Sequence, residues 1–253
     1  MSKRDVLAQV LTNENLTPDG LVKKMTLTAP ELASSARPGQ FVHLQVAQNS
    51  QPLLRRPFSI ANAAGDTLTL IYRVVGVGTK LLAEAKPGAL FPCMGTLGNG
   101  FQITGERPLL IGGGMGLAPL LFLAAKLNSP TVILGGKTAS ELFWTDLYSG
   151  LTKNMHLATD DGSIGTKGFA AALLPQVLAA EKNDIIYACG PQPMLQAVAA
   201  IAQKSGIACQ VSLEEHMACG VGACLSCTCA DIVGNRRKIC ADGPVFDARE
   251  VVL

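Results

Sequence analysis

Four of the eight cysteines lie within eleven residues of the stretch HMACGVGACLSCTC, residues 216–229. Three of them follow the spacing Cys219-x4-Cys224-x2-Cys227, and Cys240 comes after twelve further residues. A C-x4-C-x2-C run completed by a later cysteine is the plant-type pattern for a 2Fe–2S cluster bound by four thiolates. The small residues between the ligands allow backbone N–H groups to approach the sulfur atoms. We therefore predict that these four thiols bind iron.

Disulfides and zinc are two other uses of clustered thiols. The first ten residues, MSKRDVLAQV, contain no unbroken apolar segment and no small-residue cleavage site. We therefore expect a cytoplasmic protein whose thiols stay reduced. Structural zinc sites more often carry two C-x2-C pairs, and this stretch has one, so zinc is the less favoured alternative. The remaining thiol, Cys229, is interpreted as a non-ligand, although it could replace Cys227.

The composition excludes several classes of protein. A length of 253 residues allows two ordinary domains, and a net charge of +2 gives no sign of nucleic-acid binding. Glycine and proline interrupt the most apolar run, PLLIGGGMGLAPLLFLAAKL, so no membrane insertion is expected. Cys93, Cys189 and Cys209 stand in apolar surroundings and are predicted to be small buried side chains.

The chain changes character near residue 105. Residues 1–104 contain short runs with apolar–polar alternation, such as FVHLQV and TLTLIYR, which predict an antiparallel β-barrel or sandwich. Residues 105–213 repeat strand, glycine turn and helix, which predicts a parallel sheet with helices on both faces and a ligand at the carboxyl ends of its strands. Residues 214–253 form a cysteine-rich tail too short to build a core without a metal.

A glycine-rich turn, IGGGMGLAPL, follows the first strand of the second domain. Glycines at a strand-to-helix turn let backbone N–H groups face a phosphate. The match to G-x-G-x-x-G is imperfect, because the third glycine is missing and GGKT stands where an acidic residue is usual. A turn without a ligand therefore remains an alternative. Lys137 of GGKT is an isolated candidate for a 2′-phosphate, which leaves NAD and NADP both open.

The first domain carries a second motif, RRPFS, followed downstream by YRVVGVGT. An arginine beside an aromatic ring and a hydroxyl group could bind the phosphate and the ring of a flavin. The turn in GVGT could direct backbone N–H groups at a pyrophosphate. The alternative for Arg55 and Arg56 is a solvated pair of charges on an edge strand.

The order of these motifs resembles that of the ferredoxin–NAD(P)H reductase superfamily over about 200 residues. The resemblance implies FAD in the first domain and a nicotinamide nucleotide in the second, where CGPQPM closes the site. Phe58 replaces the commoner tyrosine of the flavin motif. The expected FAD contacts are Arg56, Pro57, Phe58, Ser59, Ile71, Tyr72, Arg73, Gly78 and Thr79. The expected NAD contacts are Gly112, Gly113, Gly114, Gly116, Cys189, Gly190 and Pro191.

The tail EEHMACGVGACLSCTC with NRRKICADGPVF resembles a family within that superfamily, the electron transfer subunits of dihydroorotate dehydrogenase B. This implies an FMN-containing catalytic subunit that oxidises dihydroorotate in pyrimidine biosynthesis, in an assembly of two copies of each subunit. Electrons would pass from FMN through the cluster and FAD to NAD+. Arg236, Arg237 and Lys238 could dock that partner or form an exposed hairpin turn.

No catalytic residue is predicted in the chain itself, because His43, His156 and His216 belong to no recognisable catalytic motif. Two alternatives stay open. The first is a subunit of an NAD(P)H:ferredoxin oxidoreductase or of a sulfhydrogenase-type complex, which would share the three modules. The second is a zinc-stapled, non-enzymatic nucleotide-binding module.

Overall fold

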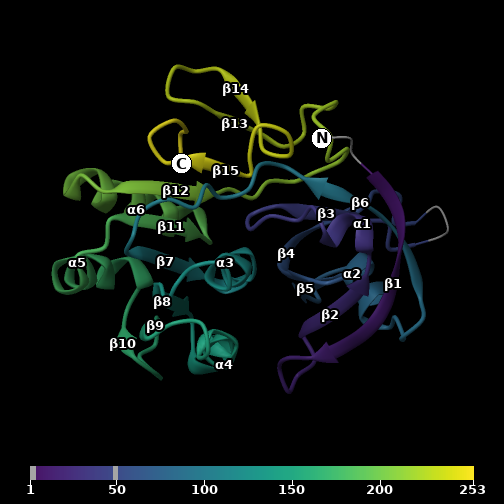
Figure 1. The fold of residues 1–253 in the computed structure, drawn as a ribbon, viewed down its shortest axis with the longest axis horizontal. Coiled ribbons are helices and arrows are strands. Elements are labelled where there is room, and N and C mark those ends of the chain that lie inside the picture. Colours follow the sequence, from purple (N-terminus) through teal and green to yellow (C-terminus); the bar gives the residue numbers. More distant parts are fainter. Residues whose placement is uncertain (1–3, 48–50) are drawn as a thin grey trace. The chain divides into compact units, whose positions relative to one another are not determined.

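The computed structural model describes residues 4–47 and 51–253 and is drawn in Figure 1. The chain divides into two compact units, each built from separate parts of the sequence. The barrel unit comprises Met1–Gly100, Glu214–Thr228 and Arg237–Pro244, and the sheet unit comprises Phe101–Leu213, Cys229–Arg236 and Val245–Leu253. The cysteine-rich tail is therefore shared between both units. That residues 214–253 form a separate domain, beside domains of residues 1–104 and 105–213, stays a prediction.

A closed antiparallel barrel forms the centre of the barrel unit, in the order β1-β2-β5-β4-β3-β6. On β5 the alternate residues Leu68, Leu70 and Tyr72 are buried, as the alternation of TLTLIYR predicts. The barrel fold is confirmed. Its strands are β1 (Arg4–Asn15), β2 (Val22–Thr28), β3 (Phe41–Leu44), β4 (Arg56–Ala64), β5 (Thr67–Arg73) and β6 (Leu90–Leu97).

Two short helices accompany the barrel. Helix α2 (Val77–Ala83) overlaps TKLLAEAKPG, the one stretch of the first domain whose sequence suggests a helix. Helix α1 (Pro30–Ala33) is a single turn that the sequence analysis did not anticipate, and Pro30 occupies its first position, where proline is well tolerated.

The sheet unit contains a mixed sheet in the order β10-β9-β8-β7-β11-β12-β15. Six strands run parallel, as the alternation of strands and helices predicts, and β15 pairs antiparallel with β12. This edge strand comes from the tail and was not predicted. The strands are β7 (Pro108–Gly113), β8 (Thr131–Gly136), β9 (Asn154–Thr159), β10 (Thr166–Lys167), β11 (Ile185–Cys189), β12 (Ala208–Ser212) and β15 (Val245–Asp247).

Helices cover both faces of this sheet. Helices α5 (Ala170–Glu181) and α6 (Gln192–Ser205) pack together on one face, and α3 (Leu117–Ala124) and α4 (Trp144–Tyr148) pack together on the other (Figure 1). Single 3-10 turns, η1 (Gly114–Gly116) and η2 (Ala139–Leu142), precede α3 and α4. The predicted α/β architecture is thus confirmed. None of the helices in the described part of the chain has the length and apolarity that crossing a membrane requires.

The tail also contains a small two-stranded sheet of β13 (Thr228–Ala230) and β14 (Arg236–Lys238). The three basic residues form β14 itself, whereas the turn is built around Asp231, whose carboxylate accepts N–H groups from Val233 and Asn235. The suggestion that the basic residues form the turn of a hairpin is therefore wrong by a few positions.

Tyr187 on β11 provides a test of this unit. Its buried hydroxyl accepts the Thr104 N–H at 2.9 Å and lies 3.0 Å from the carbonyl oxygens of Gln102 and Thr104, to which it can donate. Replacing Tyr187 by phenylalanine leaves these backbone groups without that partner and should lower the free energy of unfolding by about 1–3 kcal/mol. Urea unfolding followed by circular dichroism measures this. An unchanged unfolding curve would contradict the assigned hydrogen bonds.

Candidate functional site

The four predicted iron ligands all lie in the barrel unit, where their thiols form two pairs. The Sγ atoms of Cys219 and Cys224 are 3.2 Å apart. The N–H of Cys240 points at Sγ of Cys227 at 3.5 Å. The Gly222 N–H links the pairs by donating to Sγ of Cys240 at 3.1 Å. A 2Fe–2S cluster is bound by four thiolates, and two pairs of thiols suit its two iron atoms.

Among residues 4–47 and 51–253, no three histidine, cysteine or acidic side chains converge as a single metal ion would require. Cys227 and Cys240 are 1% exposed, whereas Cys219 and Cys224 are half-buried. Cys229 lies in β13, in the part of the tail that is assigned to the sheet unit, and its interpretation as a non-ligand stays a prediction.

Backbone N–H groups surround the sulfur of Cys219. Those of Val221 and Cys224 both point at it from 3.4 Å. Burial raises the pKa of this thiol, but the hydrogen bonds outweigh burial and lower the pKa to about 6. The pKa of Cys240 is instead raised to about 12 by burial and by the neighbouring Cys227 thiol. The low pKa of Cys219 suits its predicted role, because the thiolate is the form that binds a metal, and iron binding would have to displace the proton from Cys240.

The backbone can wrap the sulfur atoms closely because the intervening residues are small. Gly220 and Gly222 adopt φ values of +67° and +81°, which L side chains rarely adopt. A Cβ at Gly222 would lie 2.9 Å from Cβ of Ala241. His216, which precedes this loop, is exposed, as expected for a surface histidine.

The two predicted phosphate-binding elements of the flavin site lie next to each other in the barrel unit. A Cβ at Gly78 would approach Nε of Arg56 to 3.0 Å, so the guanidinium group lies over the first turn of α2. Helix N-terminal N–H groups lack intrahelical partners and, with an arginine, suit a phosphate. The hydroxyl of Thr79 accepts N–H groups from Val75 and Gly76 and donates to the Gly76 carbonyl. That hydroxyl therefore shapes the turn, and its contact with a phosphate stays a prediction.

A buried aromatic pair is linked to the other end of α2. The rings of Phe58 and Tyr72 meet edge to face with centroids 5.6 Å apart. The Tyr72 hydroxyl, whose pKa burial raises to about 12, donates to Oδ1 of Asn13 at 2.9 Å. The Asn13 amide donates in turn to the carbonyls of residues 82, 83 and 85 at the end of α2. Sequence analysis missed Asn13, because nothing near β1 resembles a flavin motif.

Four other residues on β4 and β5 are predicted to contact FAD. Pro57 and Ser59 on β4, and Arg73 on β5, are half-buried, and Ile71 on β5 is buried. The register that pairs Ile60 with Leu70 would, if continued, place Ser59 opposite Ile71. Their contacts with FAD stay predictions.

In the sheet unit, the structure brings the two predicted nicotinamide-nucleotide turns together. Gly112 at the end of β7 pairs with Cys189 at the end of β11. A Cβ at Gly116 would lie 2.5 Å from the carbonyl group of Cys189, and one at Gly190 would lie 3.0 Å from the nitrogen of Gly113. Gly114, in contrast, has a φ of +57° and open space beside it. The two turns can touch only because these glycines have no side chains. The first turn stays accessible at Gly114.

This place is the topological switch point of the sheet. Strand β7 has β8 as its neighbour on one side and β11 on the other, so the strand order reverses at β7. Ligands of open α/β sheets bind outside the carboxyl ends of the strands at such a point. Pro191 is exposed beside it, and Cys189 is only half-buried, unlike Cys93 and Cys209, which are buried as predicted.

Glu141 is an acidic group that the sequence analysis missed at the end of β8. Its carboxylate accepts the N–H of Lys137 at 3.0 Å, while the Lys137 side chain is exposed. The usual fingerprint places an acidic residue near this strand end, where it binds a ribose 2′-hydroxyl. Glu141 stands a few positions later in the sequence and returns to this strand end through η2.

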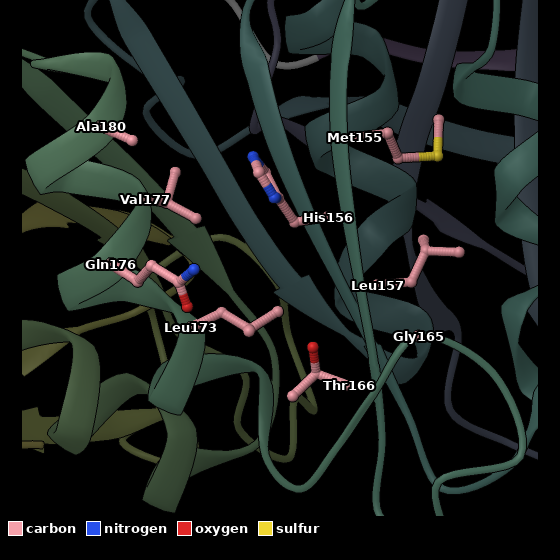
Figure 2. Close-up of a pocket in the computed structure, with 9 residues that line it drawn as sticks. All are labelled: Met155, His156, Leu157, Gly165, Thr166, Leu173, Gln176, Val177 and Ala180. Atoms are coloured by element: carbon pink, nitrogen blue, oxygen red, sulfur yellow. The ribbon is translucent and has the colours of Figure 1, made fainter.

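A separate pocket of the sheet unit lies between β9, the β10 segment and α5. Figure 2 shows His156 and Thr166 pointing toward the same space as Leu173 and Gln176 of α5. Nε2 of His156 is 2.8 Å from Oε1 of Glu181. None of the predicted cofactor-binding residues lines this pocket, so His156 stays outside the sites described above.

The fold and these sites define a class, the ferredoxin reductase-like oxidoreductases. A structure described as the NADH-dependent reduced ferredoxin-NADP oxidoreductase is 29% identical, with a TM-score of 0.86, over 98% of this chain and 90% of that one. A ferredoxin NADP+ reductase from Neisseria gonorrhoeae, with bound FAD and NADP, is 17% identical with a TM-score of 0.66, over 80% of this chain and 92% of that one. The second likeness concerns the fold alone.

Sequence comparison identifies the family. Residues 214–252 match the iron-sulfur cluster binding domain of dihydroorotate dehydrogenase B. The dihydroorotate dehydrogenase B (NAD(+)) electron transfer subunit of Caldanaerobacter subterraneus subsp. tengcongensis is 38% identical over 250 residues, 97% of this chain and 98% of that one. That of a Geobacillus species is 44% identical over 230 residues, 85% and 87% of the two chains. The chain belongs to this family of electron transfer subunits, which confirms the resemblance found in the sequence.

The cysteine assignment can be tested by substitution. Replacing Cys224 by serine removes one member of the Cys219–Cys224 pair, so the visible absorption of the cluster and the iron content should fall strongly while the flavin bands remain. Anaerobic absorption spectra and iron analysis measure both. The matched control is Cys229→Ser, which should keep its iron. Full iron content in Cys224→Ser would refute the ligand assignment.

The contact between the glycine turns can be tested with Gly116→Ala. The added Cβ would overlap the carbonyl of Cys189, so the two turns must separate. We expect KM for NADH to rise about tenfold or more, which corresponds to about 1.4 kcal/mol of lost binding, with an unchanged FAD content. Gly150→Ala is the control, since no atom lies within 4 Å of its added Cβ. An unchanged KM in Gly116→Ala would mean that NADH binds elsewhere.

Proposed function

We propose that this chain transfers electrons from the FMN of a dihydroorotate-oxidising partner subunit, through a 2Fe–2S cluster and FAD, to NAD+ in pyrimidine biosynthesis. The observation that carries the proposal is the placement of the two thiol pairs in the same compact unit as the Arg56–Gly78 flavin elements. Membership of the family supports the partner, the three cofactors and the electron transfer itself.

The division of labour follows from the chemistry. Oxidation of dihydroorotate to orotate releases two electrons and two protons, and NAD+ takes up both electrons with one proton, as a hydride. Bound FAD supplies the exchange between the one-electron chemistry of the cluster and the two-electron chemistry of nicotinamide. The chain's own residues bind and orient these groups. Arg56 and the first turn of α2 hold the flavin phosphates, and the Gly112–Gly116 and Cys189–Pro191 turns hold the nicotinamide nucleotide.

Several finer points belong to the same proposal. The carboxylate of Glu141 suits a ribose 2′-hydroxyl better than a 2′-phosphate, which favours NAD over NADP. The protein works in the cytoplasm, in an assembly of two copies of each subunit. The basic strand β14 would be the part of the tail that docks the partner.

A second candidate function rests on the likeness to the NADH-dependent reduced ferredoxin-NADP oxidoreductase, which covers nearly the whole chain. In that case the same cofactors would exchange electrons with ferredoxin, without a partner that acts on dihydroorotate. The curated relatives at 38–44% identity favour the first function.

The native complex, purified anaerobically from its source cells, distinguishes the two functions. Dihydroorotate should bleach the flavin and cluster absorption, and NAD+ added afterwards should restore it, because electrons enter at one end of the chain of cofactors and leave at the other. The visible spectrum records both steps. Bleaching by NADH or NADPH without any response to dihydroorotate would exclude the proposed partner and favour the ferredoxin-linked function.

A further inference from the structure

His43 is a buried histidine to which neither the family resemblance nor the proposed electron path assigns a role. It lies on β3, is 0% exposed, and is paired with Pro57 of β4 and Met94 of β6. Its strand is therefore hydrogen-bonded directly to the strand that carries the flavin motif.

Neither imidazole nitrogen makes a hydrogen bond of good geometry, although backbone groups of Arg55 and Cys219 lie within reach of the ring. An imidazole carries at least one N–H donor in either protonation state. A buried polar group without a partner costs about 1–3 kcal/mol, and such groups are rare in native structures. The fold therefore retains a donor at a cost in stability.

The ring faces the turn that carries the first iron ligand. A Cβ at Gly220 would lie 2.5 Å from Nδ1 of His43 and 3.1 Å from Cε1, so the imidazole occupies the space that a side chain at residue 220 would need. Gly220 follows Cys219 directly, and a backbone group of Cys219 lies within hydrogen-bonding reach of the ring. The nitrogen nearest the turn is Nδ1.

We propose that His43 is a positioning residue of the cluster site: its buried imidazole holds the Cys219–Gly220 turn and donates a hydrogen bond from Nδ1 to Cys219. The inference rests on the proposed function, because it requires the cluster. With the cluster bound, this N–H donor would favour the reduced cluster, which is the more negative state, and so raise the reduction potential of the cluster. A residue of the flavin-binding barrel would thereby tune the neighbouring electron carrier.

The test compares three substitutions in the full chain, purified anaerobically. The amide nitrogen of asparagine can take the place of Nδ1, and that of glutamine the place of Nε2, whereas leucine has no donor. We expect His43→Leu and His43→Gln to shift the midpoint potential of the cluster to more negative values and to speed iron loss to a chelator about tenfold. His43→Asn should stay near the wild type in both measurements. Redox titration followed by electron paramagnetic resonance gives the potentials.

Leu27→Ala is the control for simple loss of barrel stability. Leu27 is fully buried on β2, so this change should lower the melting temperature but leave the cluster potential unchanged. If His43→Leu binds no cluster, the inference is supported when His43→Asn retains the cluster and His43→Gln loses it. Equal behaviour of the asparagine and glutamine variants, or wild-type potentials in all three, would overturn it. A wild-type chain without a cluster signal would instead refute the proposed function.

Discussion

Close approach of backbone to backbone is the constraint on which both cofactor regions depend. In the sheet unit, Gly116 lies against the carbonyl of Cys189, and any side chain there would force the β7 and β11 turns apart. In the barrel unit, the Cys219 loop can direct N–H groups at sulfur only because Gly220 and Gly222 take left-handed conformations. A phosphate and a thiolate are both anions: main-chain N–H groups point at the Cys219 sulfur, and the proposed nucleotide-binding turns would offer the same groups to a phosphate.

The barrel also fixes a part of the tail. A Cβ at Gly98, just after β6, would meet the ring of Pro244 at 2.5 Å, and the Asn99 side chain donates to the carbonyl of Asp242 at 2.9 Å. Asp242 in turn accepts the N–H of Lys238. The segment that contains Cys240 is thus packed on the end of a barrel strand. A metal is therefore not the only element that orders the tail, contrary to the reasoning from its length.

Much of this architecture could be predicted because local patterns and long-range structure agree. Alternation in TLTLIYR and the strand–glycine–helix rhythm after residue 105 each identify their sheets. What could not be predicted depends on partners distant in sequence. Asn13 acts only through Tyr72 and α2, β15 forms only because β12 offers an edge, and Glu141 returns to β8 through a 3-10 turn. The thiol spacing predicts the four iron ligands, but the division of these thiols into two pairs required the fold.

The discontinuity of the barrel unit has a consequence for biosynthesis. A ribosome completes all six barrel strands by Leu97, then makes the whole parallel sheet as far as β12, and only afterwards supplies the four cysteines. Because chains begin to fold from the N-terminus during translation, the six strands of the barrel precede the thiols by the six parallel strands of the sheet unit and their helices. The four thiols can therefore bind iron only after the barrel strands and the six parallel strands have been synthesised.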